Sequence, residues 1–572
     1  MQLRSAAWFE GRDEIGPQSR SVLRTLGWTP EFFAGKPVIG IANGFSELNN
    51  CSLTYPALVA AAKRGVIAAG GVPLEFTTLS LGEELMKPSA MLYRNLLAME
   101  IEEVLRSYPL DGVVLISGCD KTTPAQLMAA ASANLPAIQI CAGPKLTGRW
   151  RGTEIGSGTD LWRYLDAFRA GTISAADWEA VEACYSCGAG TCNTMGTAST
   201  MAVIAEAIGM QLPGTAAIPA SDARRLAAAE ASGRRAVGLV REQLLPSQIM
   251  TRSAFANALH AFLAVGGSTN AVIHLLAIAG RLRVPLALAD VEAAARITPV
   301  LADIQPAGRQ LMAAFDDAGG VPALLGALGG LIDRTCLTVA GQPLGTTIAP
   351  PVPASAIRPF DSPLYGAEGL AVLTGNLAPR GALIRASTAS PALLRHTGAA
   401  IVFDSYQEML ERIDDPELPV TADSVLVLRN AGAVGVPGLP EWGSIPVPKK
   451  LLTQGITDLV RLSDSRMSGT SSGTVVLHIT PEAAIGGPLA LVRDGDRIAI
   501  DLAQRQLTLL VSDDELSRRR EAWHAPVSEH RRGYPRLYRE HVLQPDEGCD
   551  FDFLRPQRDE DLIFIQPIVG RS

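Results

Sequence analysis

The chain has 572 residues, of which 47% are hydrophobic and 19% charged, a composition typical of a globular protein with a large core. Its length predicts more than one domain, and its net charge of -8, without a basic stripe, argues against a nucleic-acid partner. No apolar run is long enough to span a membrane, and the polar segment 1–12 lacks the apolar centre of a secretory signal, so the expected location is the cytoplasm.

The first part of the chain alternates apolar, strand-like segments with helical ones. Residues 36–43 and 110–117 predict buried strands, because each is a short, nearly continuous apolar run. Ala- and Leu-rich stretches at 57–69, 195–208 and 254–282 predict helices. This alternation indicates an α/β fold in which helices cover a mostly parallel sheet.

The loop that follows the second predicted strand carries the most informative motif. Residues 118–125 read Gly-Cys-Asp-Lys-Thr-Thr-Pro-Ala, so a thiol, a carboxylate and an amine stand side by side. Ligand sites of open α/β sheets lie at the carboxyl ends of strands. Thiolate suits iron and carboxylate suits magnesium, so this loop could serve two adjacent metal centres. The alternative is a turn with an incidental buried Cys119.

The eight cysteines predict metal ligands rather than a disulfide scaffold. Cys192 follows a Gly-rich turn and precedes a predicted helix, whose dipole favours a thiolate. Cys184 and Cys187 form a single Cys-x2-Cys pair, too little for a structural zinc site, and we interpret their ferredoxin-like spacing to Cys192 as coincidental. The cysteines expected to be inert are Cys141, Cys336 and Cys549.

The second part of the chain has a different texture. A Pro-rich linker at 346–359 precedes short strand-like segments such as 424–429 and 473–479. Segments 489–493 and 497–502 flank Asp-Gly-Asp, which predicts a hairpin. These features indicate a β-barrel-like or sandwich domain.

The predicted organisation has three parts. Residues 1–355 form a large α/β domain, residues 356–545 a smaller β-barrel-like domain, and residues 546–572 a C-terminal tail. The charged segment 518–561 is expected to be partly helical and to pack back on the body.

Several motifs together resemble the dihydroxy-acid dehydratase and phosphogluconate dehydratase family of iron–sulfur lyases, over nearly the whole chain. They are Cys119-Asp-Lys-Thr-Thr-Pro-Ala125, the segment around Cys192, Ser80-Leu-Gly-Glu83, Gly266-Gly-Ser-Thr-Asn270, Pro440-Glu441-Trp-Gly443 and Arg466-Met-Ser468-Gly469. Within the family, the chain is most similar to the sugar-acid (aldonate) dehydratases, such as those of L-arabinonate or D-xylonate. That similarity lies in Ser46-Glu-Leu-Asn49, Gly148-Arg-Trp-Arg-Gly152 and Gly156-Ser-Gly-Thr-Asp160.

The resemblance implies two metal centres. Three cysteines would hold a [2Fe-2S] cluster, or a [4Fe-4S] cluster, and leave one iron open as a Lewis acid. They are Cys51, Cys119 and Cys192. Carboxylates and a carbamylated lysine would hold Mg2+. They are Glu83, Asp120, Glu441 and Lys121, although an unmodified Lys121 that pairs with Asp120 or Glu83 is an equal alternative.

The resemblance also implies the reaction. Ser468 would be the base, and Arg466 and Thr470 would bind the substrate carboxylate, although Thr470 is as well explained as a turn residue. The enzyme would be a hydro-lyase that converts a 2,3-dihydroxy sugar acid into a 2-keto-3-deoxy acid, assembled as a homodimer or homotetramer. The alternatives are the dihydroxy-acid dehydratase of branched-chain amino-acid synthesis and an iron–sulfur redox or sensor protein without catalysis.

The chain departs from the family pattern beside the presumed ligands. Residues 43–47 read Asn-Gly-Phe-Ser-Glu, residues 50–52 read Asn-Cys-Ser, and Ser465 precedes the Arg of the serine motif. None of these changes removes a ligand. They leave the length and configuration of the sugar acid open.

Overall fold

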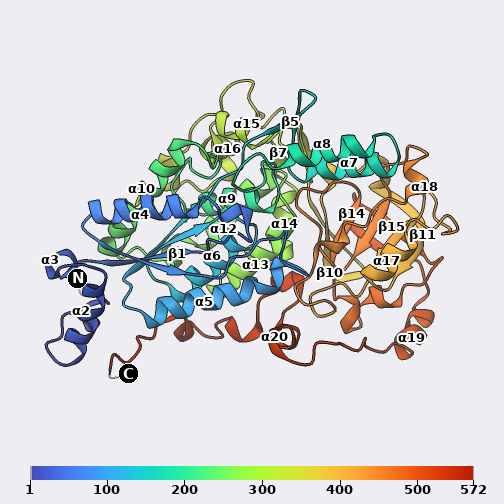
Figure 1. Cartoon of the computed structure of the whole chain (residues 1–572). Coiled ribbons are helices and arrows are strands. Elements are labelled where there is room, and N and C mark those ends of the chain that lie inside the picture. Colours follow the sequence, from blue (N-terminus) through green and yellow to red (C-terminus); the bar gives the residue numbers. More distant parts are fainter. Residues whose placement is uncertain (1–2, 571–572) are drawn as a thin grey trace.

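The computed structural model, which describes residues 3–570, contains a four-stranded parallel sheet in the order β2-β1-β3-β4 (Figure 1). Its strands are β1 (Val38–Asn43), β2 (Val72–Thr77), β3 (Gly112–Ser117) and β4 (Ala137–Cys141). The two strands predicted from sequence are confirmed as β1 and β3. Every residue of both is buried, which explains their continuous apolar runs.

Helices cover this sheet on both faces, as the alternating pattern predicts (Figure 1). Helices α4 (Tyr55–Ala68), α6 (Thr122–Ala133) and α10 (Ala223–Glu242) contact its strands. The other longer helices of this part of the chain are α5 (Arg94–Ser107), α9 (Thr197–Ala207), α12 (Arg252–Ala264), α13 (Asn270–Arg281), α14 (Leu288–Ala295), α15 (Met312–Asp317) and α16 (Gly320–Leu328). Shorter elements surround them: α1 (Ala6–Phe9), α2 (Ile15–Thr25), α3 (Pro30–Phe33), α11 (Pro246–Ile249), β7 (Pro299–Val300) and β8 (Tyr365–Ala367).

Two glycines allow the helices α4 and α10 to pack backbone against backbone. A Cβ atom on Gly65 would lie 1.9 Å from the Glu230 carbonyl oxygen, and one on Gly233 would lie 2.1 Å from the Ala62 carbonyl oxygen. Neither position has room for a larger residue, because both neighbours are main-chain atoms.

The expectation of one helical stretch over 254–282 is wrong. The segment forms two helices, α12 and α13, which Gly266 and Gly267 separate. Gly266 has a φ of +60°, a left-handed conformation that ends the first helix and that glycine adopts at little cost.

The second part of the chain forms a closed eight-stranded barrel in the order β10-β14-β13-β12-β11-β15-β16-β9. This confirms the β-barrel-like prediction. The strands are β9 (Ala371–Gly375), β10 (Ala378–Ile384), β11 (Arg395–Phe403), β12 (Val425–Leu428), β13 (Val460–Ser463), β14 (Val475–Thr480), β15 (Arg497–Asp501) and β16 (Gln506–Leu509). Strands β11, β12, β13 and β14 run parallel to one another, so their carboxyl ends share one rim of the barrel.

The predicted hairpin around Asp494-Gly-Asp496 is also wrong. The segment before it is a 3-10 helix, Pro488–Leu491, and the hairpin partner of β15 is β16. The carboxylate of Asp494 accepts the Val402 N–H, and that of Asp496 accepts the Arg493 N–H. Hydrogen bonds therefore connect the turn to β11 and close it internally, and the segment that precedes the turn does not pair with β15 as a strand.

A small insert, the hairpin β5 (Gly148–Trp150) and β6 (Thr153–Ile155) followed by the helices α7 (Thr159–Arg169) and α8 (Ala175–Tyr185), lies beside the barrel (Figure 1). The remaining helices are α17 (Tyr406–Arg412), α18 (Lys449–Leu452), α19 (Asp513–Glu521) and α20 (Gly533–His541). The last of these belongs to a C-terminal segment that runs back along the sheet domain (Figure 1).

Buried polar contacts fasten this C-terminal segment. Arg281 of α13 and Asp550 form an ion pair at 2.6 Å, with both side chains fully buried. Arg94 of α5 donates to the carbonyls of Gly548 and Cys549. The expectation that the charged tail is partly helical and packs on the body is therefore confirmed.

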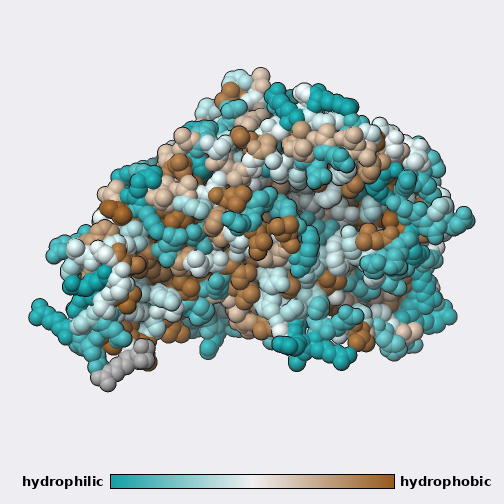
Figure 2. Space-filling view, in the orientation of Figure 1, coloured by the Kyte–Doolittle hydropathy of each residue, from teal (hydrophilic) through white to brown (hydrophobic). Residues whose placement is uncertain are grey.

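The largest hydrophobic core surrounds the sheet, and a second one fills the barrel. The predicted domain limits at 355 and 545 remain predictions. On the face shown in Figure 2, hydrophobic residues are interspersed with hydrophilic ones. Among residues 3–570, no helix is both long and apolar enough to cross a membrane.

Candidate active site

The candidate residues stand at the carboxyl ends of parallel strands, because that is where each strand releases its loop. Cys51 lies in a 3-10 turn after β1, and Glu83 in the loop after β2. Cys119 and Asp120 directly follow β3. The sheet thus presents three successive loops at one edge, as expected for a ligand site of an α/β fold.

The barrel supplies the opposite wall. Glu441 begins a 3-10 turn in the connection after β12, and Ser468 and Thr470 lie in the connection between β13 and β14. Both connections leave the rim where the parallel barrel strands end. The sheet and the barrel therefore face each other, and each presents the edge at which its parallel strands end.

A cavity of about 930 Å³ separates these walls. Among the predicted site residues, it is lined by Cys51, Glu83, Cys119, Asp120, Cys192, Glu441, Ser468 and Thr470. Lys121 and Arg466 do not line it; they lie behind the carboxylates and are 0% and 1% exposed. The structure thus brings together eight of the ten predicted residues on one surface and the other two in the layer beneath.

The three thiols are free, and two of them lie where the thiolate form is disfavoured. The hydrogen bond with Cys51 raises the pKa of Cys119 well above its ordinary value, and burial raises it further. Burial and the negative charge of Glu84 raise the pKa of Cys192. Cys184 and Cys187 do not line the cavity, and the Cys187 thiol donates to the Leu146 carbonyl instead.

Two buried cations hold the carboxylates. Lys121 pairs with Asp120 at 2.6 Å and lies 3.7 Å from Glu83. Arg466 pairs with Glu83 at 2.9 Å and with Glu441. It also donates to the Leu439 carbonyl and the Ser89 hydroxyl, so four of its five N–H groups are engaged.

The charges in this layer do not cancel. Burial alone would raise the pKa of Asp120, but Lys121 and Arg466 together hold it below its ordinary value. The pKa of Glu441 is raised, chiefly by burial, and Arg466 offsets this only in part. Three carboxylates thus face two fixed cations, and the buried Oε2 of Glu83 has no hydrogen-bond partner.

This donor set fits the two groups that the sequence implies. Carboxylate oxygens, one of them unpartnered, are the ligands that Mg2+ takes, and three thiols on one wall suit an iron–sulfur cluster. Metal binding releases protons from thiols, so a cationic group would reverse the raised pKa values of Cys119 and Cys192. In residues 3–570, no three His, Cys, Asp or Glu side chains already stand in a closed metal-ligand arrangement.

Sequence reasoning missed several residues of the cavity wall. Glu84 lines it, with a pKa that burial raises, as do Tyr185 and Trp162. Trp162 lies two residues after the Gly-Ser-Gly-Thr-Asp segment at 156–160, which had served only as a family cue. An aromatic residue in that position carries no periodic signal that would have distinguished it from a core residue.

A wider cavity of about 1310 Å³ continues from the candidate site between α7 and the barrel. Trp162, Tyr406, Trp442 and Ser468 line both spaces. The rings of Tyr406 and Trp442 stack at 4.6 Å, which makes a flat apolar wall beside the polar groups. The site therefore opens toward a chamber with room for an extended polyhydroxy chain.

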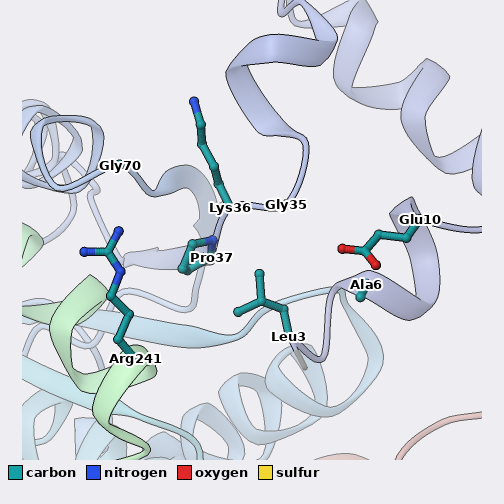
Figure 3. Close-up of a pocket in the computed structure, with 8 residues that line it drawn as sticks. All are labelled: Leu3, Ala6, Glu10, Gly35, Lys36, Pro37, Gly70 and Arg241. Carbon is teal, nitrogen blue, oxygen red and sulfur yellow. The ribbon is translucent and has the colours of Figure 1, made fainter. Parts of the chain in front are cut away.

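Another cavity, of about 640 Å³, lies near the N-terminal segment and contains none of the predicted site residues (Figure 3). The side chains of Glu10, Lys36 and Arg241 stand around it in Figure 3. Lys36 already donates to the Glu31 carbonyl and Arg241 to the Ala69 carbonyl. Its groups do not converge on a common point.

Comparison with known proteins covers almost the entire chain. The family model described as dihydroxy-acid/6-phosphogluconate dehydratase, N-terminal, matches residues 36–347, and its C-terminal counterpart matches residues 355–549. The L-arabonate dehydratase of Azospirillum brasilense is 50% identical over 564 residues, which cover 97% of each chain. The 6-deoxy-6-sulfo-D-gluconate dehydratase of Pseudomonas putida is 48% identical over 97% of this chain and 96% of its own. A dihydroxy-acid dehydratase of Moorella thermoacetica is 39% identical over 93% of this chain and 97% of its own.

Proposed function

Because this chain belongs to the dihydroxy-acid/6-phosphogluconate dehydratase family, we propose that it is a hydro-lyase that removes water from a 2,3-dihydroxy sugar acid. The product would be the 2-keto-3-deoxy acid. The observation that carries this proposal is the shared cavity, in which a serine hydroxyl from the barrel faces thiols and carboxylates from the sheet.

The sugar-acid branch is favoured over the branched-chain one. The L-arabonate and 6-deoxy-6-sulfo-D-gluconate enzymes exceed the dihydroxy-acid dehydratase in identity by about ten percentage points. The chamber beside the site, with its Tyr406–Trp442 wall, also offers space for the remaining carbons of a sugar acid. A redox or sensor role is disfavoured, because Ser468 and the three carboxylates lie on or beside the same cavity.

Cys51, Cys119 and Cys192 would hold the iron–sulfur cluster, and Glu83, Asp120 and Glu441 the magnesium ion, with Lys121 as a further oxygen ligand if it is carbamylated. When bound, these groups supply Lewis acidity toward the departing hydroxyl and the substrate carboxylate. The positive charge they bring would balance the excess of carboxylates in the buried layer.

The protein's own step is proton removal at C2. Ser468 Oγ takes this proton, the C3–O bond breaks, and a C2–C3 double bond forms, so that the hydroxyl and the proton leave as water. The resulting enol gains a proton at C3 and becomes the 2-keto acid. A positioned base is needed because the C2 hydrogen is only weakly acidic.

Arg466 receives a different role from the one expected from sequence. Its guanidinium is 1% exposed and bonds Glu83 and Glu441, so we assign it the positioning of these carboxylates rather than binding of the substrate. Thr470 remains on the cavity wall beside Ser468.

The test is an assay of anaerobically reconstituted protein with a panel of aldonates and with 2,3-dihydroxyisovalerate. Formation of a 2-keto acid from one or more aldonates is expected. Turnover of 2,3-dihydroxyisovalerate alone would instead establish the branched-chain enzyme. Reversible reduction without turnover of any acid would establish the redox protein. Light scattering at micromolar concentration is expected to show a homodimer or homotetramer.

A further inference from the structure

Trp162 connects the insert helix α7 to the loop that carries the base. Its indole Nε1 donates a hydrogen bond to Thr470 Oγ1 at 3.2 Å, and Thr470 Oγ1 lies 3.0 Å from Ser468 Oγ. Thr159, one turn earlier on the same helix, donates to the Thr470 carbonyl at 2.9 Å. The side chains of Trp162, Thr470 and Ser468 therefore form one chain of hydrogen bonds that ends on the serine.

The chemistry of its two ends sets the direction of this chain when Ser468 is deprotonated. An indole N–H can only donate, so Thr470 Oγ1 accepts from Trp162. An alkoxide can only accept, so the Thr470 hydroxyl then donates to Ser468 Oγ, 3.0 Å away. The Thr470 backbone N–H also donates to Ser468 Oγ, at 3.4 Å. A deprotonated Ser468 Oγ thus receives two donors.

The fold fixes the orientation of Thr470. A Cβ atom on Gly158, whose φ is +80°, would lie 2.0 Å from Thr470 Oγ1, and one on Gly196 would lie 2.8 Å from Thr470 Cγ2. The threonine side chain is held between these two glycines, with its hydroxyl toward α7 and its methyl toward α9. It therefore has little freedom to move Oγ1 away from Trp162 and Ser468 by rotating about χ1.

The charged groups nearby do not set this direction. Glu441 and Asp120 belong to the cavity wall, Arg466 lies behind them, and the buried Arg385 donates to the carbonyls of Gly469 and Ser471. Among the hydrogen bonds of the described residues, none joins these four side chains to the Ser468 or Thr470 hydroxyl.

We propose that Trp162 is a positioning residue, which holds Thr470 as a donor to Ser468 and so stabilises the deprotonated, proton-accepting form of the base. Donors stabilise a charged acceptor. The indole N–H polarises the Thr470 hydroxyl toward donating to Ser468 and occupies one of the two lone pairs on which Thr470 could accept the Ser468 proton. This inference rests on the proposed function, because it assigns to Trp162 a part in the same proton transfer.

The experiment compares Trp162→Phe with Trp178→Phe in the reconstituted enzyme. Trp162→Phe keeps an aromatic ring on the cavity wall, though a smaller one, and removes the donor. Trp178 stacks on Phe168 within the same insert and serves as the packing control. We expect Trp162→Phe to lower kcat about 10- to 100-fold at neutral pH, because Thr470 is then no longer held as a donor to the deprotonated Ser468, and a hydrogen bond to a charged group is worth about that much. The acid limb of its kcat profile should move to higher pH, because the base then holds its proton more tightly. Trp178→Phe should change neither.

A double-mutant cycle adds a readout that ring packing alone would not move. Thr470→Val should lose as much as Trp162→Phe or more, Thr470→Ser should recover most of the activity, and Trp162→Phe should cost nothing further in the Thr470→Val background. An unshifted acid limb in Trp162→Phe, or additive losses in the cycle, would overturn the assignment while the wild type still turns over aldonates. A wild-type enzyme that dehydrates no sugar acid would overturn the proposed function and this inference with it.

Discussion

At the scale of single residues, the site is a layered structure. Thiols, carboxylates and hydroxyls line the cavity, and two buried cations, Lys121 and Arg466, stand behind the carboxylates. Removing one member of a buried charge pair leaves the other uncompensated, so the two layers depend on each other. Substitutions of the residues that line the cavity are therefore the ones that test the chemistry of the site.

The three cysteines on the cavity wall can be distinguished by mutation from Cys184, which is partly buried, and Cys187, which is exposed. Cys51→Ser, Cys119→Ser and Cys192→Ser should each abolish the iron–sulfur absorbance of the reconstituted protein, because each removes one thiolate. Cys184→Ser and Cys187→Ser should leave it largely intact and serve as controls, since neither lines the cavity. Bleaching by the Cys187 change together with a dispensable Cys51 would point to a local cluster instead.

Ser468→Ala removes the base without removing a ligand. Both metal contents should stay unchanged, while turnover falls by roughly 10²–10⁴-fold, the contribution of a positioned base. Exchange of the substrate's C2 hydrogen with solvent should be lost in parallel, because that exchange needs the base and not the departing hydroxyl. Exchange at the wild-type rate would mean that another group takes the proton.

The motifs of the site could be predicted to a large extent, and their partners could not. Cys119, Asp120 and Ser468 lie in distinctive local sequences that follow predicted strands. Trp162 and Arg385 have no such signal, because their roles arise from contacts more than eighty residues apart in the chain. Periodicity reports which face of an element is buried but not which distant loop meets it.

At the scale of elements, glycines decide how the helices and loops approach. The strands β1 and β3 were predictable from continuous apolar runs, whereas the helix break at Gly266 and the 3-10 turn at 488–491 were not. The predictions of one helix over 254–282 and of a hairpin at 494–496 were both wrong, because tertiary contacts select a backbone conformation that the local sequence pattern does not show. The α4–α10 contact shows the same dependence on single glycines.

Two glycines of α10 make a matched pair for stability. Gly233→Ala should lower the free energy of unfolding by about 1–3 kcal/mol, since its methyl group would meet the Ala62 carbonyl. Gly238→Ala would meet only the flexible end of Arg235, so it should be neutral or gain up to about 1 kcal/mol from helix propensity. Denaturant titrations of both variants measure the difference. Equal effects would contradict a close contact between the backbones of α4 and α10 at Gly233.

Glu206 of α9 should make stability depend on pH. Burial raises its pKa from 4.5 to about 7, despite hydrogen bonds from the backbone N–H groups of Gly214, Thr215 and Ala216. Between these values the folded chain holds a proton that the unfolded chain has lost, so the free energy of unfolding falls as pH rises, by up to roughly 3 kcal/mol. This contribution is present in full below about pH 4.5 and is lost as pH rises through 7.

The measurement is the slope of the unfolding free energy between pH 5 and 7. Glu206→Gln should be less stable overall, because its amide cannot accept all three N–H groups, yet its slope should be smaller than that of the wild type. Parallel curves for the two proteins would assign the slope to other groups.

At the scale of the whole molecule, the C-terminal segment joins the two parts of the fold. It leaves the barrel, passes α20 and reaches back to α5 and α13 (Figure 1). Its partial helicity and its return to the body were expected from the sequence. The buried ion pair that fastens it did not, because neither Arg281 nor Asp550 differs in sequence from an ordinary surface charge.

Breaking this fastening should be costly. Asp550→Asn removes the fully buried counter-charge of Arg281 and leaves it only the pair with Glu102 at 3.2 Å, so it should lower the free energy of unfolding by about 3–5 kcal/mol. The double variant Arg281→Met/Asp550→Leu should recover much of that loss, because neither charge of the pair then remains buried, and Glu102 keeps its pair with Arg106. Protease sensitivity of the tail is an independent readout, and a tail that stays protected in Asp550→Asn would contradict the role of the pair.

The placement of the site on two walls has a consequence for synthesis of the protein. The three thiols lie within the first 192 residues, whereas Glu441, Ser468 and Thr470 belong to the last third of the chain. A nascent chain therefore exposes all three of the proposed thiol ligands on the ribosome before the proposed base and the opposite wall exist. Under the proposed function, the cluster can be loaded before catalysis is acquired, and until the barrel folds against them the thiols lie open to oxygen.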